Sequence, residues 1–278
     1  MVLLFFAFPC AQSSGLQNST KTFTPVVEMS SKDWEDPVEM ERVWQAALVR
    51  IPNGEGKYLS STIEALHRQE ITITTTYPTV IYLHGCSGVW KGTYTRINIL
   101  AKHGYAVIAP VSFARKKYPQ SCDPATHQAN MYRGTLRMCQ YDAGYAIEKA
   151  KALSWVDSNN VFLVGLSQGG ITTATFSSIT ENASVNARVI EGWTCNAGWN
   201  EYKGIHAPKS EPVLTLVGAI DPWFQNSWTR GDCEDSLNKE NDSQSIVYKD
   251  GYLSQQHELL ESKAVQATVL QFLQSHIK

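Results

Sequence analysis

The sequence lacks several features that would assign it to a class of protein. No apolar run approaches the roughly 18 to 20 residues that a membrane-spanning helix needs, so no membrane span is expected. The 24 basic and 26 acidic residues are spread along the chain without a basic stripe, and a net charge of −2 does not favour a nucleic acid partner. Repeats, low-complexity tracts and linkers are also missing. The 278 residues are therefore expected to form one large domain.

The strongest apolar segment lies at the N-terminus. Residues 2–11 (VLLFFAFPCA) are apolar and are followed by small polar residues, which is typical of a secretory signal peptide, although the usual preceding positive charges are missing. We predict a signal peptide over residues 1–13, an N-terminal arm over 14–40 and a single domain over 41–278, in a secreted or periplasmic protein. A buried first strand, or a lipoprotein signal at Cys10, are the alternative interpretations.

Cysteine is sparse, and no C-x-x-C pair or Cys/His spacing indicates a metal site. Five cysteines would remain after loss of the signal peptide, and an oxidising compartment favours two disulfides and one free thiol. The sequence leaves their connectivity open. The expected pairs join neighbouring loops, Cys122 to Cys139 and Cys195 to Cys233, which leaves Cys86 as the odd thiol.

From residue 78 onward, short β-branched runs alternate with segments of helical spacing. The expected strands are 78–83, 105–111, 161–164, 187–193, 212–217 and 245–248, and the expected helices are 95–103, 129–153, 168–178 and 258–277. This alternation predicts the α/β class, with a mostly parallel sheet covered by helices on both faces. Ligand sites on such sheets lie at the carboxyl ends of the strands.

Polar signals follow three of these strands. Ser167 lies in a G-x-S-x-G motif between a strand and a helix, where glycines allow the sharp turn that presents a nucleophile. Asp221 follows the strand PVLTLV and His257 follows SIVY, so the order is Ser, Asp, His along the chain. Alone, the aspartate could cap a turn and the histidine could be a surface residue. Together they predict a catalytic triad.

An oxyanion site is expected at the Gly-rich loop HGCSG (84–88). The backbone amides of Cys86 and Gln168 would be its donors. Cys86 as the nucleophile is the rival hypothesis, which a missing helix N-terminus disfavours. His84 is interpreted as a structural histidine rather than the base.

With these motifs the chain resembles an α/β-hydrolase, and within that superfamily the dienelactone hydrolase-like group. The matching stretches are YLHGCSG, GYAVIAP, YDAGYAIEKAKAL, NVFLVGLSQGG, LTLVGAIDPW and His257, between about residues 75 and 278. The resemblance implies an α/β-hydrolase fold with an eight-stranded, mostly parallel sheet, Ser167 as nucleophile, His257 as base and Asp221 as orienting acid. Dienelactone hydrolase proper has cysteine at the elbow, so serine here favours an ordinary carboxylic ester over dienelactone.

Two long connections, 192–211 and 222–244, are rich in aromatic residues and follow strands that end near the triad. We interpret them as walls of a substrate pocket, and the alternative is that they fill the core under long loops. The expected pocket residues are Trp193, Trp199, Trp223 and Trp228.

The predicted function is hydrolysis of a small-molecule ester through an acyl-enzyme, which requires no cofactor or metal. A peptidase or acyltransferase could use the same triad, and a non-catalytic binding protein is the alternative from another class. The sequence indicates no oligomeric state.

Overall fold

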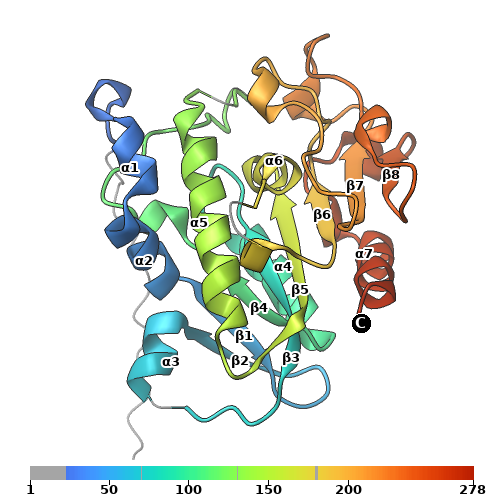
Figure 1. Ribbon diagram of the computed structural model, residues 1–278. Helices are drawn as coiled ribbons and strands as arrows, with labels where there is room; N and C mark the ends of the chain where they lie inside the picture. Colours follow the sequence, from blue (N-terminus) through green and yellow to red (C-terminus); the bar gives the residue numbers. More distant parts are fainter. Residues whose placement is uncertain (1–22, 70, 130, 179–180) are drawn as a thin grey trace, which may run out of the picture.

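A computed structural model of the chain describes residues 23–69, 71–129, 131–178 and 181–278 (Figure 1). The predicted signal peptide and the first residues of the predicted arm lie outside these ranges. Within them, no helix combines the length and apolar character needed to cross a membrane.

One eight-stranded sheet forms the centre of the fold, with the strand order β2-β1-β4-β3-β5-β6-β7-β8. The strands are β1 (Leu48–Pro52), β2 (Tyr58–Thr62), β3 (Tyr77–Leu83), β4 (Ala106–Ala109), β5 (Val156–Leu166), β6 (Arg188–Glu191), β7 (Val213–Gly218) and β8 (Gln244–Tyr248). β1 pairs antiparallel with β2 and β4, and all other pairs are parallel. The predicted α/β class and mostly parallel eight-stranded sheet are confirmed.

Helices cover both faces of the sheet. Alternate residues of the central strands point to opposite faces, and the helices bury the apolar side chains of each face. The helices are α1 (Ser31–Glu35), α2 (Pro37–Gln45), α3 (Ile63–Gln69), α4 (Lys91–Lys102), α5 (Gly134–Lys151), α6 (Gln168–Thr175) and α7 (Lys263–Ser275). Ile81 and Leu163 face the side of α2, α3 and α5, and their neighbours Val80 and Phe162 face the side of α4 and α7. Figure 1 shows α5 running along the front of the sheet.

Three predicted helices are shorter in the structure, and one of them, 168–178, simply ends at Thr175. The segment 129–153 becomes helical only at Gly134, because the Met131 amide donates to the Ser121 carbonyl at 2.9 Å in the preceding loop rather than within a helix. The segment 258–277 divides into a 3₁₀ turn, η8 (Leu259–Glu261), and α7. The amide of Leu260 donates to the Glu191 carboxylate at 2.7 Å, which draws this turn toward the sheet and away from the helix.

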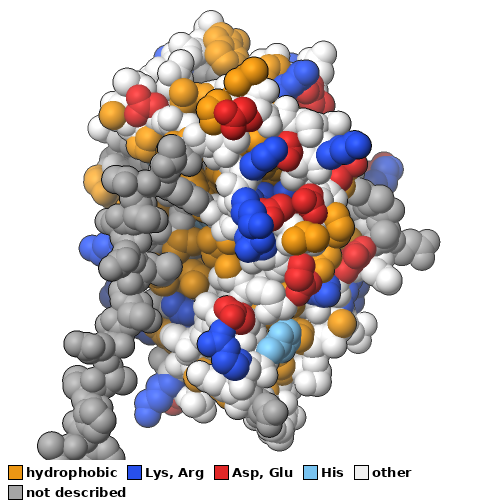
Figure 2. Space-filling model, turned by 90° about the vertical axis from the view of Figure 1, so that its left-hand side faces the viewer, with side chains coloured by type: hydrophobic (Ala, Val, Ile, Leu, Met, Phe, Trp, Pro, Cys, Tyr) orange, Lys and Arg blue, Asp and Glu red, His pale blue; other side chains and the backbone are white. Residues whose placement is uncertain are grey.

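The predicted N-terminal arm contains α1 and the start of α2, which crosses the expected boundary at residue 40. Asp36 caps α2 through a hydrogen bond from the Val38 amide, and both helices lie against α5. Contacts such as the hydrogen bond from Tyr141 to Glu35 join them to the domain. On the face that carries these helices, basic and acidic side chains are interspersed rather than gathered by sign (Figure 2).

Candidate active site

Ser167 lies at the turn between β5 and α6, in a conformation that L-residues rarely adopt. Its φ is 57° and its ψ is −117°, and its amide donates to the Glu191 carbonyl at 2.8 Å. The turn needs its glycines: a Cβ on Gly165 would lie 2.1 Å from the Gly169 carbonyl oxygen, and one on Gly169 would lie 2.1 Å from that of Leu83. The flanking glycines therefore allow a strained residue to stand at the strand end.

Asp221 and His257 meet beyond the ends of β7 and β8. His257 Nδ1 lies 2.7 Å from Asp221 Oδ2, and the Asp221 side chain is 1% exposed. The other carboxylate oxygen of Asp221 accepts the Trp223 amide at 2.9 Å, at the start of a 3₁₀ turn, η5 (Pro222–Phe224). A carboxylate so placed selects the tautomer with the proton on Nδ1 and leaves Nε2 as an acceptor. Nε2 of His257 is buried and has no hydrogen-bond partner among the described residues.

Gly192 makes room for His257. Its φ is +64°, and a Cβ there would lie 2.8 Å from the His257 carbonyl oxygen and 3.0 Å from the ring atom Cε1. Gly218, at the end of β7, is crowded by the backbone just before His257, since a Cβ on it would have three carbonyl oxygens within 2.8 Å. Two strand ends thus lack side chains where the histidine loop passes.

Ser167 and His257 line the same cavity, whose volume is about 410 Å³. Trp223 lies on the His257 ring, with ring centroids 5.3 Å apart and an interplanar angle of 29°. The remaining wall consists of Gly85, Cys86, Ser87, Trp90, Pro124, His127, Leu166 and Glu258. The three residues of the predicted triad therefore share one site, with Asp221 behind His257.

Cys86 also borders the cavity, and Gln168 borders a smaller space of about 20 Å³ beside Ser167. The Gln168 side chain is engaged elsewhere: its Oε1 accepts from Ser121 at 2.5 Å and its Nε2 donates to Tyr118 at 2.9 Å. Any contribution of Gln168 to an oxyanion site must therefore come from its backbone amide. His84 is buried, and its Nε2 accepts the Ser112 amide at 3.2 Å, which is a structural role.

One predicted disulfide pairing is wrong. Cys122 is bonded to Cys86 rather than to Cys139, and Cys139 is a buried free thiol. The loop before α5 folds back so that Cys122 meets the Gly-rich loop, whereas Cys139 lies inside α5. The bond excludes Cys86 as a nucleophile, because a disulfide sulfur is not a thiolate.

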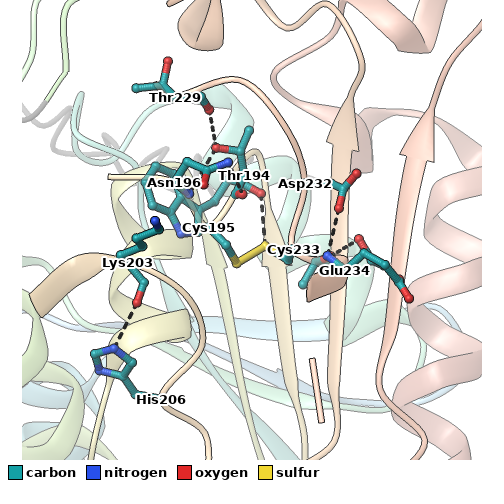
Figure 3. The surroundings of a disulfide bond; sticks show 12 residues. Thr194, Cys195, Asn196, Lys203, His206, Thr229, Asp232, Cys233 and Glu234 are labelled. Carbon is teal, nitrogen blue, oxygen red and sulfur yellow. Dashed lines mark hydrogen bonds between the residues drawn. A yellow bond between two sulfur atoms is a disulfide. The ribbon is translucent and has the colours of Figure 1, made fainter. Parts of the chain in front are cut away.

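The second disulfide joins Cys195 to Cys233 (Figure 3). Beside it, Thr194 Oγ1 donates to the Thr229 carbonyl at 2.5 Å and Asn196 Nδ2 donates to the Arg230 carbonyl at 3.0 Å. The two long connections that follow β6 and β7 are thus linked covalently and by hydrogen bonds.

The structure separates the four tryptophans expected in the pocket. Trp223 lines the cavity, and Trp193 is buried and borders the smaller space beside Ser167. Trp199 packs against Tyr202 with ring centroids 6.2 Å apart, and Trp228 is 60% exposed. Neither of these two lines the spaces beside Ser167: Trp199 packs against a core cluster, whereas Trp228 faces solvent.

Sequence reasoning missed a buried ion-pair network below the cavity. Arg96, on α4, contacts both carboxylate oxygens of Glu191 at 2.6 and 2.7 Å, and its Nη1 donates to Glu258 at 3.0 Å. Burial opposes the charge of Arg96, but Glu191 raises its pKa overall. Burial raises the pKa of Glu258, which Arg96 partly offsets. The network joins α4, the end of β6 and the residue after His257.

The other cavity residues that sequence reasoning missed are Trp90, Pro124, His127 and Glu258. Only Glu258 had a usable signal, as the neighbour of the predicted base. His127 has a φ of 52°, and its ring lies 5.3 Å from that of Trp223, which no local pattern indicates. Among the described residues, His, Cys, Asp and Glu do not gather in groups of three suited to a metal ion.

Comparisons with known proteins agree with this architecture. The model of the dienelactone hydrolase family matches residues 64–271. No curated protein sequence matches. A putative dienelactone hydrolase from Klebsiella pneumoniae subsp. pneumoniae MGH 78578 is similar in structure, with a TM-score of 0.52, 18% identity, and coverage of 73% of this chain and 89% of that chain. A dienelactone hydrolase-like promiscuous phosphotriesterase from metagenomic libraries has a TM-score of 0.53 at 18% identity, covering 74% and 89%.

Proposed function

Because this chain belongs to the dienelactone hydrolase family, we propose that it is a serine hydrolase that cleaves carboxylic esters of small molecules through Ser167, His257 and Asp221. One observation carries the proposal: the 2.7 Å contact between His257 and Asp221 beside the cavity that Ser167 also lines. Serine at the elbow, where cysteine would make a thiolate nucleophile, favours a general-base mechanism on an ordinary ester.

In this mechanism, Nε2 of His257 takes the proton of the Ser167 hydroxyl as its oxygen attacks the acyl carbonyl. Asp221 stabilises the imidazolium that forms. The backbone amides of Cys86 and Gln168 bind the tetrahedral oxyanion, and each such donor typically contributes on the order of 100- to 1000-fold in rate. The imidazolium then protonates the leaving alcohol, and the acyl-enzyme is hydrolysed by a water that His257 deprotonates.

Export to an oxidising compartment belongs to the same proposal. Two disulfides support it, because such bonds persist in secreted and periplasmic proteins. The Cys86–Cys122 bond also ties the loop that supplies the Cys86 amide to the loop before α5. A fixed oxyanion donor is worth more than a mobile one, since it needs no reorganisation during the reaction.

The test is hydrolysis of p-nitrophenyl acetate by the wild-type protein and by Ser167→Ala. We expect alanine to keep the shape of the turn, so the variant should fold. Its kcat for p-nitrophenyl acetate should be at least about 1000-fold below that of the wild type. Equal rates in the two proteins would overturn the proposal. Transfer of the acyl group to an added alcohol or amine, in preference to water, would favour the acyltransferase alternative.

A further inference from the structure

The described lining of the active-site cavity contains one carboxyl side chain and no Lys or Arg. Two aromatic rings, Trp90 and Trp223, form its broad apolar surfaces, and the first of these is 40% exposed. Glu258 supplies the one carboxyl side chain in the described lining, beside the triad, and its ion pair with Arg96 at 3.0 Å favours the charged form. Among the described residues that line it, the only basic groups are the imidazoles of His127 and His257.

The network behind Glu258 does not neutralise it. Arg96 is the single cation between two carboxylates, and its bidentate contact is with Glu191. The side chains of Arg96 and Glu191 are buried, with exposed fractions of 0% and 1%, whereas 24% of the Glu258 side chain is exposed. Two negative charges against one positive charge leave one negative charge in excess, and its accessible part belongs to Glu258.

Two basic residues of the segment after β4 are paired away from the cavity. Arg115 is buried and bonded to Asp142 at 2.6 Å. Lys117 contacts Asp33 on α1 at 3.2 Å. Neither lines the cavity. Inside a partly desolvated cleft, an uncompensated charge acts on a substrate more strongly than it would in water.

We propose that this cavity selects esters by charge, accepting uncharged and cationic groups next to the reacting carbonyl and disfavouring carboxylates, with Glu258 as the specificity-determining residue. The inference rests on the proposed ester hydrolysis. A cationic group gains attraction to Glu258 and can lie against the faces of Trp90 and Trp223. A carboxylate meets repulsion there and finds no Lys or Arg in the described lining.

The experiment uses three thioesters of acetate that differ mainly in the charge of the leaving thiol. The thiols carry a trimethylammonium group, the uncharged tert-butyl group of the same shape, or a carboxylate. Thiol release is followed with a thiol reagent at pH 8. We expect kcat/KM for the anionic thioester to be on the order of tenfold below that of the uncharged one. The cationic thioester should equal or exceed the uncharged one.

Glu258→Gln keeps a hydrogen-bond acceptor for Arg96 and removes the charge, so it should raise the anionic-to-uncharged ratio about tenfold. Glu261→Gln is the matched control, because Glu261 is exposed on the adjacent turn and does not line the cavity. Its ratio should stay at the wild-type value.

The wild-type protein tests the proposal without any variant. Added salt should bring the anionic and uncharged rates closer together, because ions screen the repulsion. Equal rates for all three thioesters at low salt, or a ratio that Glu258→Gln leaves unchanged, would overturn the selectivity. If none of the three thioesters is hydrolysed although p-nitrophenyl acetate is, the selectivity is overturned and the proposed function stands. If p-nitrophenyl acetate is not hydrolysed either, the proposed function is overturned, and the selectivity with it.

Discussion

Oδ2 of Asp221 lies 2.7 Å from Nδ1 of His257, while Oδ1 of the same carboxylate accepts the Trp223 amide at 2.9 Å. One carboxylate thus contacts the His257 imidazole, the proposed base, and caps the turn whose tryptophan lies on that imidazole. The position of His257 and the wall of the cavity therefore depend on the same side chain.

Asp221→Asn separates these two roles. The asparagine carbonyl can still accept the Trp223 amide, so the turn should form, but its NH₂ group would favour the wrong histidine tautomer. We expect kcat for p-nitrophenyl acetate to fall on the order of 1000- to 10,000-fold, with a melting temperature close to that of the wild type. Full activity in a folded variant would contradict the orienting role.

Gly192→Ala should displace His257. The added methyl group would lie 3.0 Å from Cε1 of the imidazole, and the alanine would have to adopt a φ of +64°. We expect a loss of about 1 kcal/mol or more in the free energy of unfolding and a clear loss of kcat. Gly56→Ala is the control, because its φ is +63° and no atom lies within 4 Å of the added carbon. The control should lose stability but keep its kcat; an equal loss of kcat in both would argue against the steric explanation.

Alkylation followed by peptide mapping tests the cysteine assignments. Burial raises the pKa of Cys139 to about 11, so little thiolate forms at pH 8 and the native protein should react slowly there. In denaturant without reductant, Cys139 should be alkylated, and the four disulfide cysteines only after reduction. Alkylation of Cys86 before reduction would contradict the pairing with Cys122.

Arg96→Met tests the network below the site. The change leaves Glu191 buried without its cation, and breaking a buried pair in this way typically costs about 3 to 5 kcal/mol of the free energy of unfolding. Arg68→Met is the control, because the Arg68–Glu64 pair lies on an exposed helix surface and its removal should change stability by less than about 1 kcal/mol. Denaturant unfolding measures both, and a loss in Arg96→Met no larger than in the control would contradict the importance of the network.

The parts of this molecule that follow from local patterns could be predicted from the sequence. Parallel strands place their ends on one edge, so residues after separate strands, such as Ser167, Asp221 and His257, could be assigned to one site. The N-terminal helices and the antiparallel hairpin of β1 and β2 were not predicted. Their segments are short, and they are held in place by contacts with distant parts of the chain, α1 and α2 with α5, and β1 with β4.

Contacts between distant segments explain the remaining differences. Cys122 is 17 residues from Cys139 and 36 from Cys86, yet the fold of the intervening loop selects the distant partner. Trp90 and His127 reach the cavity from two different loops, and Arg96 meets Glu191 across 95 residues. Such pairings depend on the assembled sheet, which a single sequence does not specify in detail.

The most direct test of the proposed nucleophile is a fluorophosphonate probe with mass mapping of the labelled peptide. The probe phosphonylates a serine that a neighbouring base activates, and it should label the wild-type protein at Ser167 within the peptide after β5. His257→Ala should slow this labelling strongly, and Ser167→Ala should abolish it. Absence of labelling in the folded wild-type protein, or equal labelling of Ser167→Ala, would contradict the assignment of Ser167 as the nucleophile.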